Sequence, residues 1–175
     1  MLILVTGSLM IVFGSAETSD FWGDCLRLWW NQVRTSFPGV KRLVIYLDNG
    51  PNNNGNRTQF IKRMIEFADW SGLEILLVYY PPYHSKYNPI ERCWSALEKK
   101  WGGSLLNSLK VVLMFALRMT WNGRPPTVKC LHGDYPIGVK VSRQEWKSLQ
   151  PRLERSDTLP KYRVLIKPLI AAPVS

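Results

Sequence analysis

Cysteine is scarce in this sequence, and the three cysteines present, Cys25, Cys93 and Cys130, are far apart. None belongs to a Cys-x-x-Cys pair, so the pattern indicates neither a disulfide framework nor a zinc site. Long apolar runs are also lacking, because no stretch reaches the roughly 18 residues that a transmembrane helix needs. These absences argue against a disulfide-stapled secreted domain and against a membrane-spanning protein, and they favour a reducing, cytoplasmic setting.

The apolar N-terminus has only part of the pattern of a secretion signal. Residues 1–17 combine an apolar run with a small-residue ending, but they contain no Lys or Arg, and Thr6-Gly7-Ser8 interrupts the run. A signal peptide begins with a basic segment. Two short β-rich runs around a glycine, Leu2–Val5 and Leu9–Phe13, instead predict a hairpin.

Acidic residues are few: 13 Asp and Glu stand against 23 Lys and Arg, which gives a net charge of +10. Residues 120–175 carry a net charge of +6, against +4 for the longer stretch of residues 1–119. Such a basic surface favours a polyanionic partner, most often a nucleic acid. A surface that only keeps the protein in solution is the alternative.

Apolar runs alternate with helical stripes along residues 19–119, which is typical of an α/β fold. The predicted elements are a helix from about Asp20 to Val33 capped by Ser19, a strand over Leu43–Leu47 buried on both faces, a helix from about Arg57 to Trp70, a strand over Leu73–Tyr80, and helices over Pro89–Trp101 and Ser104–Met119. Ile90, Trp94, Leu97 and Trp101 form the apolar stripe of the third helix. After Trp121, Pro and Gly multiply, and we expect an irregular basic tail with one short helix near Arg143–Leu153.

Two carboxylates stand at positions that an open sheet uses for ligands. Asp48 follows the strand Leu43–Leu47, and Glu91 stands at the start of the helix after the next strand. If the two strands are neighbours, both side chains lie at the carboxyl edge of one sheet. Paired carboxylates can hold Mg²⁺ or Mn²⁺, and bound metal ions assist phosphoryl transfer.

Each carboxylate also has a purely structural explanation. Asp48 opens Asp-Asn-Gly-Pro, which is a strong turn sequence. In Asn88-Pro89-Ile90-Glu91, the asparagine can cap the helix and Glu91 can close a capping box. The functional interpretation depends on both residues falling at the same expected edge.

The loop before Glu91 is rich in aromatic and basic side chains, namely Tyr79, Tyr80, Tyr83, His84, Lys86 and Tyr87. Aromatic rings can stack on unpaired bases, and lysine can contact phosphate. We predict that DNA is contacted by this loop and by the helix after it, through Tyr83, Lys86, Tyr87, Arg92, Lys99 and Lys100. A rigid loop and an ordinary solvated helix face are the alternatives.

A specific motif, Asn-Pro-Ile-Glu-x-x-Trp, surrounds Glu91 and follows the Asp-Asn-Gly segment at Asp48. The distance between these two segments matches that in a known protein family. With LVIYLDNGP before it, this region closely resembles the catalytic core of DDE transposases of bacterial insertion sequences, and most of all the Rhodopirellula-type DDE group. The resemblance runs from about Gly7 to about Lys167 and weakens after Trp121.

The resemblance implies a ribonuclease-H-like fold with two divalent metal ions, Mg²⁺ or Mn²⁺, held by three carboxylates. Water or a DNA 3′-hydroxyl would attack a phosphodiester. Asp48 matches the second carboxylate of the family and Glu91 matches the third. DNA is the implied partner.

The family's first Asp, on the first strand of its sheet, has no match here, and neither do its DNA-end-binding helices. The acids before Asp48 are Glu17, Asp20 and Asp24, and none of them ends an apolar strand. We therefore expect a partial ribonuclease-H-like domain over residues 1–120, which lacks the first strands, and a basic C-terminal extension over residues 121–175.

The resulting hypothesis is a truncated DDE transposase that is inactive alone. The alternative is a non-catalytic DNA-binding remnant of a transposase. A metal-independent enzyme with an acid pair, such as a glycosidase, is disfavoured. Missing strands would leave an apolar sheet edge open, and this edge would pair with a second copy or with an absent N-terminal half.

Overall fold

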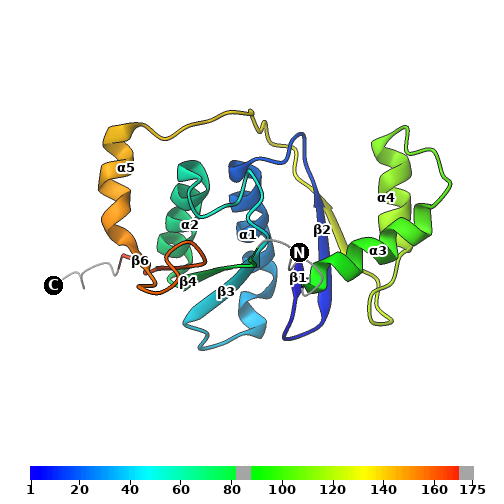
Figure 1. Cartoon of the computed structure of the whole chain (residues 1–175). Helices are drawn as coiled ribbons and strands as arrows, with labels where there is room; N and C mark the ends of the chain where they lie inside the picture. Colours follow the sequence, from blue (N-terminus) through cyan, green and yellow to red (C-terminus); the bar gives the residue numbers. More distant parts are fainter. Residues whose placement is uncertain (82–87, 170–175) are drawn as a thin grey trace. The chain divides into compact units, whose positions relative to one another are not determined.

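The computed structural model describes residues 1–81 and 88–169 of the 175-residue chain. Helices and strands alternate in a mixed α/β fold, which confirms the predicted class (Figure 1). The chain divides into two compact units, one made of residues 1–15 and 83–132 and the other of residues 16–82 and 133–175. Within the described ranges, no helix is long and apolar enough to cross a membrane.

The first unit contains a three-stranded sheet with the order β1-β2-β5. β1 (Leu2–Ile3) pairs antiparallel with β2 (Ser8–Phe13), which confirms the predicted hairpin. Gly7 has the left-handed φ of 64° that the turn between them requires. β5 (Thr127–Cys130) runs parallel to β2 and pairs with it from Met10 to Phe13.

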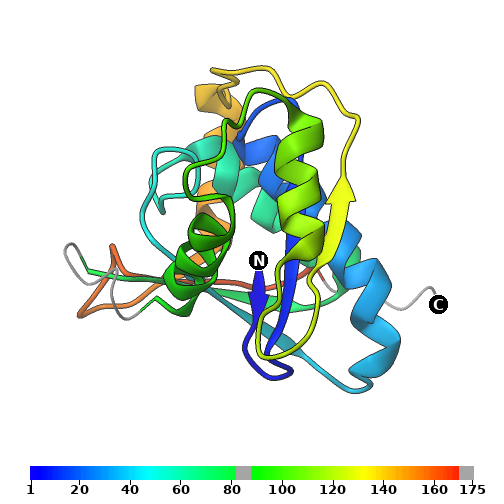
Figure 2. The same cartoon turned by 90° about the vertical axis from the view of Figure 1, so that its right-hand side faces the viewer.

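Two helices, α3 (Pro89–Trp101) and α4 (Leu109–Arg118), pack in this unit (Figure 2). The core formed between the helices and β2 consists of Leu9, Ile11, Cys93, Leu97, Ala116 and Met119. Trp94 was expected on the buried stripe of α3, but it is 39% exposed, and Cys93 is buried instead. α4 is shorter than predicted, because Ser108 caps it through a hydrogen bond from the Val111 N–H.

The second unit contains a four-stranded sheet with the order β3-β4-β7-β6. β3 (Arg42–Leu47) and β4 (Glu74–Tyr79) are parallel, and each residue of one is paired with a residue of the other. β7 (Arg163–Ile166) joins the other side of β4 in the antiparallel direction, and β6 (Leu153–Arg155) pairs antiparallel with β7.

The C-terminal part of the chain is not the irregular tail that the sequence predicted. β5, β6 and β7 all follow Trp121, and α5 (Arg143–Leu149) with the 3-10 helix η3 (Gln150–Arg152) occupies the position of the predicted short helix. The strands were missed because each is only three or four residues long, too short for alternation to be visible. The expected boundary at residue 120 stays a prediction, although both sheets take strands from each side of it.

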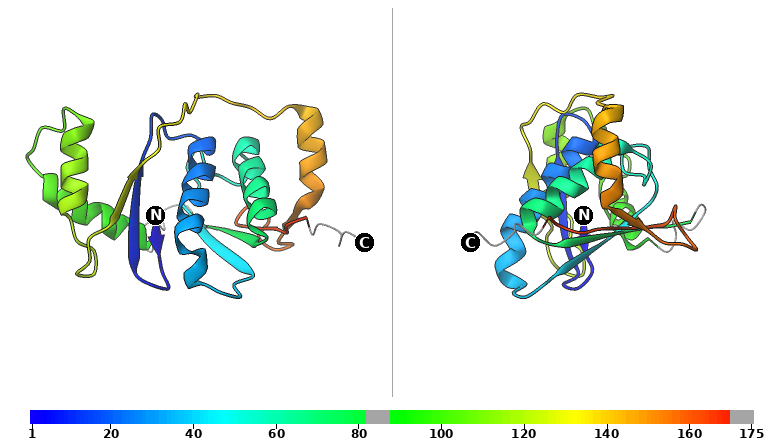
Figure 3. Two further views of the ribbon diagram at one scale, coloured as in Figure 1. Left: turned by 180° about the vertical axis from the view of Figure 1, so that it is seen from behind. Right: turned by 90° about the vertical axis from the view of Figure 1, so that its left-hand side faces the viewer.

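Helices α1 (Ser19–Val33), continued by the 3-10 helix η1 (Arg34–Ser36), and α2 (Thr58–Ser71) lie side by side in the second unit. α2 and α5 lie on the same side of the sheet (Figure 3). Thr18 caps α1, rather than the predicted Ser19, and its hydroxyl oxygen accepts a hydrogen bond from the Phe21 N–H. A bidentate ion pair from Arg152 lowers the pKa of Asp69 near the end of α2.

Arg63 on α2 connects the two long helices electrostatically. Its guanidinium group forms ion pairs with Asp20 and Asp24 on α1 and with Glu66 on α2. Gly23 leaves room for it, because a Cβ at that position would lie 2.6 Å from Arg63 Nε. Asp20 and Asp24, which precede Asp48 in the sequence, therefore have structural partners, and both lie on a helix rather than at a strand end.

β3 is not buried on both faces as predicted. The helices cover only the face that carries Leu47, while Val44 and Tyr46 on the opposite face are 41% and 49% exposed. Among the described residues, β3 is also an edge strand, since β4 is its only partner. The apolar run was misread because a strand half exposed in this way looks, in sequence, like one covered on both sides.

Replacing Ile166 by alanine tests whether the C-terminal strand belongs to the core. Ile166 has 0% exposure, so Ile166→Ala is expected to lower the free energy of unfolding by about 2–5 kcal/mol. Leu165→Ala, on the half-buried opposite face of β7, is the control and should cost clearly less. Urea denaturation measures both values, and equal losses would contradict a buried β7.

Candidate active site

Asp48 lies directly after β3, at the carboxyl end of a parallel strand, as predicted. The Tyr80 N–H donates to the Leu47 carbonyl over 2.9 Å, so the strand pairing continues up to the residue before Asp48. The Asp48 side chain is exposed. This is the edge at which open α/β sheets bind ligands.

The Asp48 carboxylate also forms a turn. Its Oδ1 accepts a hydrogen bond from the Gly50 N–H over 3.2 Å and another from Asn53 Nδ2 over 3.0 Å. Asn49 between them has a φ of 63°, a left-handed conformation that asparagine tolerates. No described residue donates to Oδ2. The turn and ligand interpretations are therefore compatible, because they use different oxygens.

The loop after Asp48 is anchored by several parts of the second unit. Its bonds are Ser19 Oγ to the Asn52 carbonyl (2.8 Å), Asn52 Nδ2 to the Glu17 carbonyl (2.8 Å), Tyr79 Oη to the Asn53 carbonyl (3.1 Å) and Arg155 Nη2 to the Gly55 carbonyl (2.7 Å). The anchors come from the start of α1, from β4 and from β6. Asp48 thus precedes a loop that is hydrogen-bonded to three separate parts of the second unit.

Glu91 lies in the first turn of α3, where its negative charge interacts favourably with the positive end of the helix dipole. Asn88 caps the helix by accepting a hydrogen bond from the Ile90 N–H over 3.3 Å, and Pro89 follows it, as predicted. The predicted capping box does not close, since no hydrogen bond runs from the Asn88 N–H to the Glu91 side chain. Glu91 is exposed and its carboxylate has no partner in the described part of the chain.

Asp48 belongs to the second unit and Glu91 to the first, and their meeting at one site stays a prediction. Each is an exposed carboxylate with at least one oxygen that no described residue engages, and such hard oxygen ligands suit Mg²⁺ or Mn²⁺. Over residues 1–81 and 88–169, no group of three or more His, Cys, Asp or Glu side chains is placed to hold a metal ion.

The predicted DNA-contacting residues on α3 are accessible. Arg92, Lys99 and Lys100 are exposed, and none forms an ion pair with a described residue. Tyr83, His84, Lys86 and Tyr87 lie outside the described residues.

The first unit carries more net positive charge than the larger second unit. Residues 1–15 and 83–132 carry eight Lys and Arg but only two acids, Glu91 and Glu98. All ion pairs between side chains of described residues lie in the second unit. There Arg152 and Lys167 are neutralised by Asp69 and Glu154. The smaller first unit, which includes α3, therefore holds more than half of the net charge of +10.

Two tyrosines have roles that the sequence did not indicate. Tyr79 was grouped with the loop before Glu91, but it is 2% exposed and its hydroxyl donates to the loop after Asp48. Burial raises its pKa far above the usual value, so the hydroxyl stays protonated and remains a donor. Tyr80 packs beside Tyr46, with ring centroids 6.0 Å apart.

Sequence reasoning also missed Asn53, which is 5% exposed although it is polar. The available signal was the run Asn52-Asn53-Asn54 in a loop that follows a candidate ligand. Nothing in the run distinguishes the asparagine that faces Asp48 from its two neighbours.

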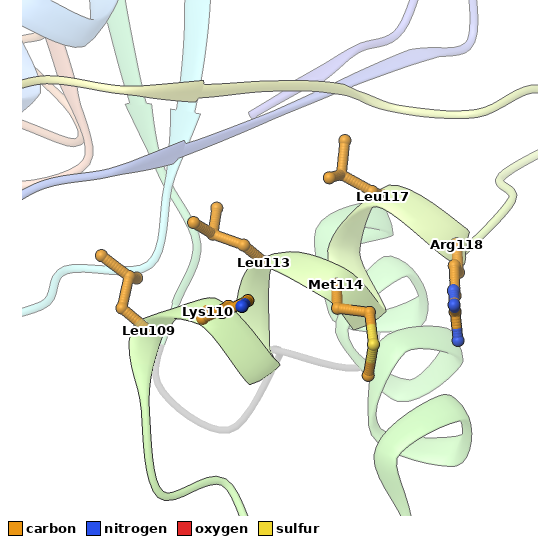
Figure 4. Close-up of a pocket in the computed structure, with 6 residues that line it drawn as sticks. All are labelled: Leu109, Lys110, Leu113, Met114, Leu117 and Arg118. Carbon is orange, nitrogen blue, oxygen red and sulfur yellow. The ribbon is translucent and has the colours of Figure 1, made fainter.

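Two cavities can be described among residues 1–81 and 88–169, and neither is lined by Asp48 or Glu91. The larger, of about 540 Å³, is an apolar surface hollow on α4 lined by Leu109, Lys110, Leu113, Met114, Leu117 and Arg118 (Figure 4). A second, of about 250 Å³, lies beside the loop after Asp48, and Pro51, Asn52 and Arg57 are part of its lining.

A scan against protein families matches residues 3–168 to the family described as the Rhodopirellula transposase DDE domain. This match covers most of the chain and confirms the suspected family. No curated protein and no solved structure matches the chain.

Proposed function

Because the chain belongs to the Rhodopirellula transposase DDE domain family, we propose that it takes part in DNA transposition, with Asp48 and Glu91 as two of the carboxylates that hold divalent metal ions. The family uses divalent metals and has DNA as its partner. The proposal includes Mg²⁺ or Mn²⁺ as the ion, a partial ribonuclease-H-like arrangement and a cytoplasmic location.

The observation that carries the proposal is the state of the Asp48 carboxylate. It is exposed at the carboxyl end of a parallel strand, with Oδ1 engaged by two donors and Oδ2 engaged by none that the structure describes. The carboxyl edge of an open α/β sheet is where ligands usually bind. Glu91, exposed on α3, would supply the second ligand.

In this proposal, the charge of each side chain determines whether it binds the metal ion or the DNA. A bound divalent ion supplies stabilisation for the negative oxygens of a phosphodiester under attack. Asp48 and Glu91 would hold it, while the exposed cations of α3, Arg92, Lys99 and Lys100, would contact the DNA backbone. We propose that a third carboxylate comes from a second polypeptide.

A second candidate, a DNA-binding remnant without catalysis, is favoured by one observation. Of the acids before Asp48, Asp20 and Asp24 are held on α1 in ion pairs with Arg63 and so do not replace the family's first Asp. DNA binding without metal dependence would then be the whole activity, and its affinity would depend strongly on salt.

Replacing Glu91 by glutamine separates the two candidates. For a transposase, Glu91→Gln is expected to lower metal-dependent cleavage of plasmid DNA by at least about 100-fold, because several kcal/mol of charge stabilisation are removed. Binding of DNA in a gel-shift assay should persist. Glutamine keeps the size of the side chain and its place in the first turn of α3.

The wild-type chain with Mg²⁺, with Mn²⁺ and with a chelator provides the reference. Cleavage that survives both the chelator and the substitution would contradict the metal site. Salt-sensitive DNA binding that neither Mg²⁺ nor Mn²⁺ changes, with no cleavage by the wild-type chain, would favour the remnant.

Removing Lys99 and Lys100 tests the DNA-contacting face of α3. Eliminating one contact to a phosphate should reduce the slope of log affinity against log salt by about 0.9, so the double alanine variant is expected to show a slope smaller by roughly 2. Lys167→Ala is the control, because this lysine is exposed but paired with Glu154. Fluorescence anisotropy over a salt series measures the slopes, and equal slopes for both variants would refute the contact.

The free edge of β3 predicts self-association of the purified chain. An unpaired strand edge with exposed apolar side chains is a template for pairing with a second copy. Val44→Lys should shift the chain toward monomer in light scattering after gel filtration. Val40→Lys is the matched control, since Val40 is 40% exposed and lies before the strand. A wild-type monomer that unfolds cooperatively would count against the prediction.

A further inference from the structure

Asn53 is a buried polar side chain that holds Asp48 from within its own loop. Its Nδ2 donates to Asp48 Oδ1 over 3.0 Å, and its backbone N–H donates to the Gly50 carbonyl over 3.3 Å. Its own carbonyl accepts the hydroxyl of Tyr79 over 3.1 Å. Both the side chain and the backbone of Asn53 are therefore fixed.

Tyr79 supports this arrangement from the core of the second unit. It lies at the end of β4, and its ring packs against Gly55, where an added Cβ would lie 3.2 Å from the ring. Gly50 is similarly confined, because a Cβ there would lie 3.1 Å from Asn53 Oδ1 and 3.4 Å from Asp48 Oδ1. The two glycines allow the loop to close tightly around the pair Asp48 and Asn53.

Asn53 also carries a cost that a turn former would not need. Its Oδ1 is buried and has no hydrogen-bond partner among the residues that the structure describes. A buried acceptor without a partner loses its hydration without compensation. The hydrogen bond to Asp48 is the one side-chain hydrogen bond that Asn53 makes with a described residue, so this bond is what the buried position provides.

We propose that Asn53 is a positioning residue for Asp48, held in place by Tyr79, and that it orients the carboxylate so that Oδ2 faces a divalent metal ion. This inference rests on the proposed function. Asn53 itself does not contact the ion. Partners that orient a ligating carboxylate in this way typically change metal affinity by about 10- to 100-fold when they are removed.

The chain offers a matched control in the neighbouring residue. Asn54 Nδ2 donates to the Gly50 carbonyl, and its Oδ1 accepts from the Asn56 N–H, but it does not contact Asp48. Asn54→Ala thus removes two hydrogen bonds from the same loop and leaves the bond between Asp48 and Asn53 intact. A role in loop rigidity alone predicts similar effects for Asn53→Ala and Asn54→Ala.

The experiment measures Mn²⁺ affinity of the full chain by water-proton relaxation. Asn53→Ala is expected to weaken Mn²⁺ binding by about 10- to 100-fold and Asn54→Ala by less than about 3-fold. Tyr79→Phe keeps the ring and removes only the hydroxyl, so it should weaken binding more than Asn54→Ala does and less than Asn53→Ala does. It also tests the proposal if Asn53→Ala fails to fold.

A second readout needs no metal. In ¹⁵N spectra, Asp48→Ala should shift the side-chain amide signals of Asn53 and leave those of Asn54 in place. Unchanged Asn53 signals would overturn the contact, and equal losses of Mn²⁺ affinity in the two asparagine variants would overturn the positioning role alone. Equal Mn²⁺ binding by wild type and Asp48→Ala would instead overturn the proposed function, and the positioning role with it.

Discussion

The parallel pairing of β3 with β4 is the constraint on which the second unit depends. Because the strands run in the same direction in full register, their carboxyl ends lie at one edge of the sheet. Asp48 follows β3 at that edge, and Tyr79 ends β4 beside it. A shift of one residue would turn Tyr79 away from the helices, and its hydroxyl would no longer reach the Asn53 carbonyl.

Asp48 shows how one side chain can serve both structure and chemistry. A carboxylate has two oxygens, and here the turn uses only Oδ1. The left-handed Asn49 and the confined Gly50 are then features of a loop that sharply defines the direction of a carboxylate. Glu91 lacks comparable support among the described residues and depends mainly on the first turn of α3 for its position.

The sequence predicted the long elements and the two carboxylates well, since their signals are local. Helix α3 begins at Pro89 because a capping asparagine and a proline specify its start, and Asp48 follows an apolar run. The predictions that failed concern residues whose structure depends on contacts with residues far away in the sequence. β7 has only four residues and becomes a strand through its pairing with β4. The burial of Tyr79 and Asn53 could not be predicted either, because it arises from contacts between β4 and a loop distant in sequence.

The antiparallel pairing of β7 with β4 also determines when the sheet can be completed during synthesis of the chain. During synthesis β3 and β4 emerge early, but β4 stays unpaired on one side until residues 163–166 have been made. A two-stranded ribbon is only marginally stable, and contacts between residues far apart in sequence form slowly. The nascent chain therefore carries an incomplete sheet from the completion of β4 at Tyr79 until β7 has been made, a state of the kind that chaperones shield during folding.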